Sequence, residues 1–139
     1  MIMASAGWGD PARRKGLPPA ASGWLASRVG RRSPSVPSPV ATLPPHRLSE
    51  SQLAALRATG ADVDLSDDAR IARAAGRSYL DLLALRSGSF AVPDAVVRPT
   101  AEQVGAVLRT GVTMVPFGGG TSVVGGVAPL GSPVVALDL

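Results

Sequence analysis

Apolar residues recur every three or four positions through the middle of the chain, which is the periodicity of an amphipathic helix. The clearest segments are 49–60, 66–76 and 100–111. Their expected N-caps are Ser49, Ser66 and Thr100, and a glycine ends each segment. The stretch 78–88 carries three spaced leucines and fits either a short helix or a turn.

The last fifty residues change to short β-branched runs, which are typical of buried strands. These runs are 94–99, 112–117 and 133–139. The predicted order is strand, helix, strand, glycine-rich loop and strand, with the loop at the carboxyl end of a strand. Ligands of α/β sheets usually bind at that edge. The predicted fold class is α+β, with short helices and a small, incomplete sheet after an irregular N-terminal segment.

Residues 1–47 contain eight prolines, which interrupt regular structure, and only a short helix near Ala20–Val29 is expected there. Seven basic residues face a single Asp10 in this segment, whereas residues 48–139 carry seven arginines against nine acidic residues. The net charge of +4 therefore comes from the N-terminal segment. No basic stripe with stacking aromatic residues follows, so nucleic acid is not the expected partner. Salt-dependent binding of the basic segment to nucleic acid or anionic lipid stays open as an alternative.

Composition excludes several kinds of chemistry. The chain has no cysteine and a single histidine, His46, in the proline-rich linker, so no metal site is predicted and His46 is expected to be solvated. No secretory signal and no apolar run of about 20 residues are present. We expect a cytoplasmic protein without a transmembrane segment.

The stretch 115–126, VPFGGGTSVVGG, has the composition of a nucleotide-binding loop. Glycines let a ligand approach the main chain, and successive N–H groups form a nest for an anion. A Walker loop is excluded because no lysine follows the glycines, and a dinucleotide fingerprint is excluded because no helix-forming sequence does. The residues alone leave a phosphate cradle and a tight hairpin loop as equal alternatives.

The segment 98–130, RPTAEQVGAVLRTGVTMVPFGGGTSVVGGVAPL, resembles the flavin-pyrophosphate region of the FAD-linked oxidases of the vanillyl-alcohol oxidase or p-cresol methylhydroxylase (PCMH) type. In that family a P-x-G-G-G-T-S loop holds the FAD pyrophosphate with its main-chain amides. The resemblance implies FAD-binding roles for Pro116, Phe117, Gly118, Gly119, Gly120, Thr121, Ser122, Gly125 and Gly126. It implies non-covalent FAD, because the loop has no His or Cys that could form a flavin linkage.

The segment 78–100, SYLDLLALRSGSFAVPDAVVRPT, resembles the alkyldihydroxyacetonephosphate synthase branch of this family. The implied organisation is an irregular segment 1–47, a helical lead-in 48–93, and the first part of an FAD-binding domain, 94–139. The family's second flavin subdomain and substrate domain would follow. We therefore expect an N-terminal portion of an oxidoreductase or synthase-like flavoenzyme, or alternatively a non-catalytic fragment with little flavin binding.

No residue is nominated as a catalytic acid or base, so the sequence leaves enzymatic activity open. Asp94 and Asp138 border strands and are expected to be turn or cap residues. Arg98 is expected at the surface, with assistance to the pyrophosphate as the alternative. The last strand has no later partner in the chain, which leaves a sheet edge and a helix face uncovered. Such surfaces favour association with a missing C-terminal part or with a second copy.

Overall fold

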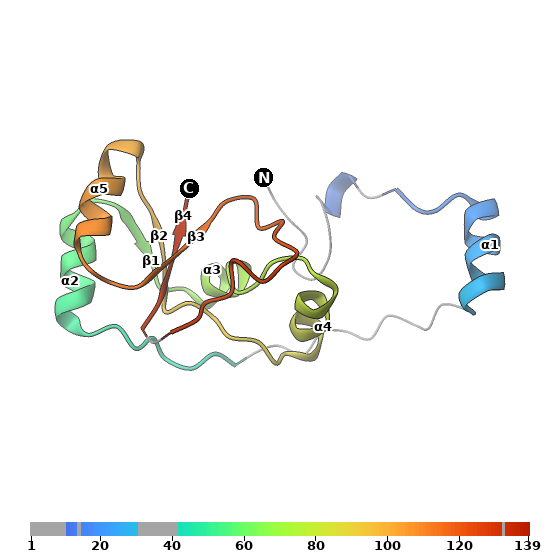
Figure 1. Cartoon of the computed structure of the whole chain (residues 1–139), viewed down its shortest axis with the longest axis horizontal. Coiled ribbons are helices and arrows are strands. Elements are labelled where there is room, and N and C mark those ends of the chain that lie inside the picture. Colours follow the sequence, from blue (N-terminus) through green and yellow to red (C-terminus); the bar gives the residue numbers. More distant parts are fainter. Residues whose placement is uncertain (1–10, 14, 31–41, 132) are drawn as a thin grey trace.

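Four short strands form one mixed sheet in the order β1-β2-β4-β3 (Figure 1). The computed structural model describes residues 11–13, 15–30, 42–131 and 133–139. The strands are β1 (Asp62–Asp64), β2 (Ala95–Arg98), β3 (Met114–Phe117) and β4 (Val135–Asp138). β4 pairs in parallel with both β2 and β3, whereas β1 is antiparallel to β2. β4 is therefore a central strand, and the edge strands are β1 and β3.

Helix boundaries follow local capping chemistry. The helices are α1 (Pro19–Val29), α2 (Glu50–Ala58), α3 (Asp67–Ala72), α4 (Tyr79–Ser87) and α5 (Ala101–Arg109), with a 3-10 turn, η1, at Pro11–Arg13. Ser78 and Asp81 form a capping box, and Gly88 ends α4 at a φ of 74°, so 78–88 is a helix and not a turn. Helix α3 ends at Ala72, four residues before Gly76, the residue that the sequence predicts as its end.

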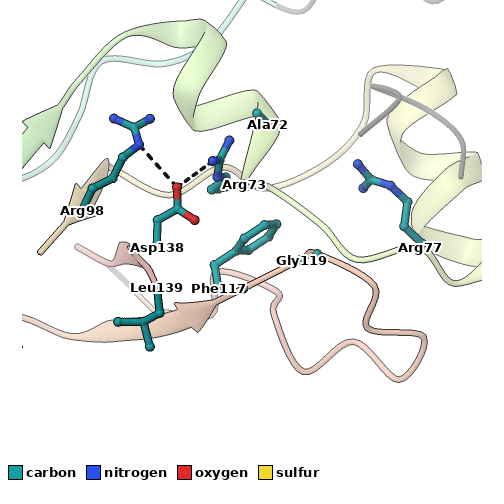
Figure 2. A pocket seen from close by; sticks show the side chains of 10 residues that line it. Ala72, Arg73, Arg77, Arg98, Phe117, Gly119, Asp138 and Leu139 are labelled. Atoms are coloured by element: carbon teal, nitrogen blue, oxygen red, sulfur yellow. Dashed lines mark hydrogen bonds and ion pairs between the residues drawn. The ribbon is translucent and has the colours of Figure 1, made fainter. Parts of the chain in front are cut away.

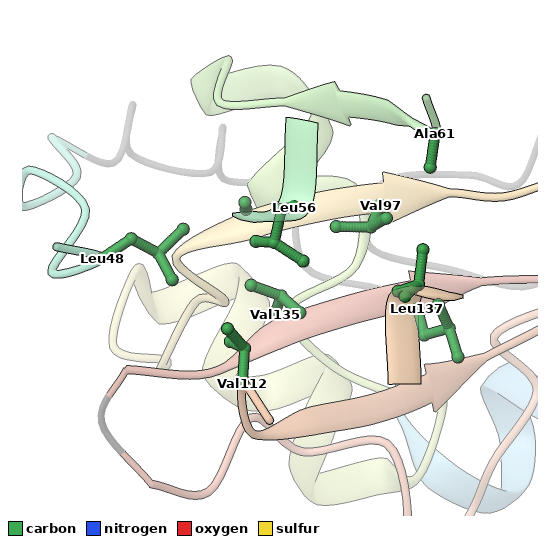
Figure 3. Close-up of a cluster of buried hydrophobic side chains, with 9 residues drawn as sticks. Leu48, Leu56, Ala61, Val97, Val112, Val135 and Leu137 are labelled. Atoms are coloured by element: carbon green, nitrogen blue, oxygen red, sulfur yellow. The ribbon is translucent and has the colours of Figure 1, made fainter. Parts of the chain in front are cut away.

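The two faces of the sheet bury different side chains, because alternate residues of a strand point to opposite faces. One face packs against α2 and α5 in the main apolar cluster (Figure 3). Its buried members are Leu48, Leu56, Ala61, Ala95, Val97, Val107, Val112, Val135 and Leu137. The opposite face forms a smaller cluster, which consists of Ala69 of α3 with Val96, Phe117 and Ala136. Phe117 thus lies on the α3 side of the sheet.

β1 escaped sequence-based prediction because its sequence, DVD, has one apolar residue between two carboxylates. Val63 packs against the main cluster, whereas Asp62 and Asp64 point to the α3 side, where they pair with Arg98. The strand is thus fixed by ion pairs as much as by apolar burial.

Asp94 is a buried residue that joins Arg47, at the end of the segment 1–47, to the sheet. Its side chain is 1% exposed and accepts hydrogen bonds from the Arg47 main chain at 2.8 Å and the Arg47 guanidinium at 3.0 Å. It also accepts the N–H of Val134 at 2.8 Å. The expectation of a turn or cap residue understates this role. His46, expected to be solvated, has a buried Nδ1 atom without a partner among the described residues.

Replacement of Asp94 by asparagine is expected to lower the free energy of unfolding by about 1–3 kcal/mol. Both carboxylate oxygens of Asp94 accept from N–H donors, so one of them would be replaced by an NH₂ group that faces a donor. Urea unfolding of Asp94→Asn against the wild type measures the loss. Equal midpoints would contradict the role assigned to this carboxylate.

The stability conferred by Asp94 should also depend on pH. Burial alone raises the pKa of Asp94, but hydrogen bonds from Arg47 and from the Val134 N–H outweigh burial and hold the pKa below its usual value. Its contribution is therefore complete above the unfolded pKa of about 3.9 and is lost as the pH falls through the folded pKa. The difference in unfolding free energy between wild type and Asp94→Asn should shrink below about pH 4. A constant difference down to pH 2 would contradict it.

Candidate functional site

Parallel pairing brings three strand ends to one edge of the sheet. Phe117 of β3 is the register partner of Asp138 of β4, and Arg98 ends β2 one position beyond the Val97–Leu137 pair. Arg98 Nε lies 3.3 Å from Asp138 Oδ2, which confirms that these two residues meet. The glycine loop leaves β3 at this same carboxyl edge, where ligands of parallel sheets bind.

A cavity of about 660 Å³ opens at this edge (Figure 2). Its volume is in the range of small-molecule sites. It is lined by Ala72, Arg73, Arg77, Arg98, Phe117, Gly118, Gly119, Gly120, Asp138 and Leu139. Four of the nine residues predicted to bind a cofactor therefore lie at the cavity, namely Phe117, Gly118, Gly119 and Gly120. Pro116, Thr121, Ser122, Gly125 and Gly126 do not line it.

The glycines at the cavity have different physical roles. Gly120 adopts a φ of 65°, and a Cβ there would lie 2.8 Å from the Phe117 ring, so only glycine fits. Gly118 has no heavy atom within 4 Å of an added Cβ, and Gly119 has only a Thr121 methyl group at 3.9 Å. Gly120 therefore shapes the turn, while Gly118 and Gly119 leave open space beside their main chain.

The main-chain N–H groups of the glycine loop favour an anionic ligand. Within the described part of the chain, none of the hydrogen bonds is donated by the N–H of Gly118, Gly119 or Gly120. Successive free N–H groups in a glycine turn form an anion nest. The Ser122 hydroxyl also stabilises the loop, because Ser122 Oγ accepts the Gly126 N–H at 3.2 Å.

Ser122 anchors the loop to the segment between α3 and α4. The Arg77 N–H donates to the Ser122 carbonyl at 2.6 Å. Gly76 lies against the same carbonyl so closely that a Cβ on Gly76 would overlap it. The glycine expected to end the third helix thus has another purpose, which is to let the loop approach the main chain.

Three arginines supply positive charge at the cavity, and sequence analysis weighed only Arg98 among them. Arg98 pairs with Asp62 at 2.8 Å and Asp64 at 3.1 Å, so three carboxylates including Asp138 surround it. Burial alone lowers the pKa of Arg98, but the hydrogen bonds to the β1 carboxylates raise it above its usual value. Most of the charge of Arg98 is compensated within the protein, so Arg98 mainly links β1, β2 and β4 through ion pairs.

Arg73 and Arg77 come from the segment that leaves α3. Arg77 is 5% exposed and donates through Nη1 to the carbonyls of Ala75 and Gly76, and burial lowers its pKa. Arg73 pairs with Asp138 at 2.6 Å and lies 5.6 Å from the centre of the Phe117 ring. No sequence motif singled out these two residues, because α3 and the loop are about 45 positions apart in the chain.

The described residues contain no group of three or more His, Cys, Asp or Glu that could hold a metal ion. Within the same ranges, no helix is long and apolar enough to span a bilayer.

The fold is α+β, with a glycine loop and an arginine-lined cavity at the carboxyl edge of a small sheet. No family model and no curated protein sequence matches the chain. Two solved structures of alkyldihydroxyacetonephosphate synthase, in different crystal forms, share this fold at TM-scores of 0.82 and 0.84 and 21% identity. Each match covers 99% of this chain, which spans only 32% and 31% of the synthase chains.

Replacement of Gly76 by alanine is expected to destabilise the protein by about 1–3 kcal/mol, because the added methyl must push the Ser122 carbonyl away. Gly105→Ala in α5 is the matched control, since its Cβ meets only the flexible end of Arg109 at 3.4 Å. The control should be neutral or slightly stabilising. Thermal unfolding of both variants makes the comparison, and equal melting temperatures would show that the Gly76–Ser122 contact is dispensable.

Proposed function

We propose that the chain binds FAD non-covalently and that its glycine loop receives the pyrophosphate of the flavin nucleotide. The N–H groups of Gly118, Gly119 and Gly120 carry this proposal, because none of them has a hydrogen-bond partner among the described residues and all three glycines line the cavity. Charge-assisted hydrogen bonds to such N–H groups are about twice as strong as neutral ones. The choice of FAD among phosphate ligands is supported by the loop's resemblance to PCMH-type flavoproteins and by the synthase fold.

The cavity fits one end of a dinucleotide better than a whole flavin. Its wall combines glycine main chain, the Phe117 ring and three arginines, which suits a phosphate-bearing group. The described residues that line it come from α3 and the segment after it, from the loop and from the strand ends. We infer that this chain supplies the pyrophosphate half of a flavin site and that further polypeptide would contact the ring system.

When bound, FAD would supply redox or electrophilic chemistry, and the residues of this chain would position it. The loop would hold the diphosphate, Gly76 and Ser122 would fix the loop, and the arginines would compensate phosphate charge. No residue of the cavity is placed as a catalytic acid or base. Membership of a synthase-like or oxidase-like flavoenzyme is accordingly proposed for the complete enzyme, of which this chain would form the N-terminal part.

Titration of the 139-residue chain with FAD, followed by flavin fluorescence, tests the proposal. We expect saturable binding that Gly119→Val weakens about tenfold or more, because the side chain would fill the space beside the N–H groups. Gly119 is the best position for this test, since a substitution there meets no main-chain atom within 4 Å, whereas Gly120→Val would also disrupt the turn.

Gly105→Val provides the control, because it adds the same side chain on α5, away from the cavity. It should bind FAD as the wild type does. A folded wild-type chain that binds no FAD would favour the alternative of a non-catalytic chain without flavin binding. Equal affinity of Gly119→Val and wild type would refute the cradle.

A further inference from the structure

Asp138 occupies the position of an anion within the arginine cluster. Its Oδ2 atom accepts from Arg73 at 2.6 Å and lies 3.3 Å from Arg98 Nε, so one carboxylate oxygen bridges two guanidinium groups (Figure 2). The side chain is 14% exposed and lines the same cavity as the glycine loop. An incoming phosphate would meet the carboxylate and the two cations together.

The two bridged arginines differ in how much of their charge is compensated. Arg98 has the additional carboxylates of Asp62 and Asp64. Arg73 has Asp138 as its only ion-pair partner among the described residues, and its buried Nε atom has no hydrogen-bond partner within those ranges. A guanidinium has five N–H donors, so most of the donors of Arg73 are available. Of these two arginines, Arg73 is therefore the one from which an anion gains more.

The position of Arg73 also joins it to the loop. It is the C-cap residue of α3, its guanidinium lies over the Phe117 ring, and that ring in turn fills the space beneath Gly120. The side chain is 26% exposed and lines the cavity. Phe117 keeps the guanidinium at the cavity wall while its N–H groups stay free to bind.

We propose that Arg73 is the cationic ligand of the glycine-loop site and that Asp138 is an internal competitor for it. Without ligand, Asp138 neutralises and orients Arg73. A diphosphate takes over part of the guanidinium at the cost of repulsion from the Asp138 carboxylate. A diphosphate can place one phosphate at the loop N–H groups and the other at Arg73, and these two contacts together offset that repulsion better than the single contact of orthophosphate, so the site selects diphosphates over orthophosphate. The inference rests on the proposed function in placing phosphate at this loop, but it makes a separate claim about two side chains.

Isothermal titration of the full chain with inorganic pyrophosphate tests the role of Arg73. We expect Arg73→Gln to weaken binding about tenfold, because a charge-assisted contact is lost. Arg73→Lys should recover part of the affinity, since it restores the charge without the planar fork. Wild-type affinity in Arg73→Gln, or no pyrophosphate binding by the wild type, would overturn the assignment.

The competitor role makes the opposite prediction for Asp138→Asn, which should strengthen pyrophosphate binding about threefold and reduce the preference over orthophosphate. Asp64→Asn is the matched control, because it removes the same charge from the same network but contacts Arg98 and not Arg73. Its affinity should change by less than about twofold. A purely structural pair would make both Arg73→Gln and Asp138→Asn weaken binding, and that result would reject the competitor.

The same variants titrated with FAD separate this inference from the proposed function. If the wild type binds pyrophosphate but not FAD, the proposal that the chain binds FAD is rejected and the anion-binding role of Arg73 is retained. If wild type and Arg73→Gln bind FAD equally, the proposal of FAD binding is retained and the role assigned to Arg73 is rejected. Circular dichroism checks folding, and if Arg73→Gln is unfolded, weaker binding by Arg73→Lys together with stronger binding by Asp138→Asn supports the inference, whereas any other combination rejects it.

Discussion

The parallel pairing of β4 with both β2 and β3 is the constraint on which the candidate site depends. Parallel strands in register end at one edge, and here those ends are Arg98, Asp138 and Phe117. Pairing in the other direction would place the end of β4 at the opposite edge from the glycine loop. Because β4 lies between β2 and β3, the three strand ends meet only when β4 occupies the middle of the sheet.

Two long-range contacts hold the surroundings of this edge. Asp94 ties Arg47 and the start of β4 to β2 through charge-assisted hydrogen bonds. Gly76 and the Arg77 N–H tie the loop to the segment between α3 and α4 through Ser122. A loop rich in glycine has high conformational entropy when free, so such anchors are needed to hold it in one conformation at the cavity.

Similarity to the synthase structures places these features in a wider context. The whole chain superimposes on about a third of the synthase chain, at an identity that supports the fold alone. In the function proposed above, the anion site therefore rests on the loop and its N–H groups, and the overall likeness supports only the choice of FAD among phosphate ligands. Beside the loop, Asp138 pairs with Arg73, so the positive charge of Arg73 is already partly compensated before any ligand binds.

The sequence by itself determined the helix starts, three of the four strands and the glycine loop, because caps, β-branched runs and glycine act within a few residues. It did not reveal β1, whose two carboxylates gain their place only by pairing with Arg98. Nor did it reveal the early end of α3 or the cavity positions of Arg73, Arg77 and Asp138. Tertiary structure decided these, since each depends on strand order and on contacts between segments far apart in the chain, and local propensity carries no information about either.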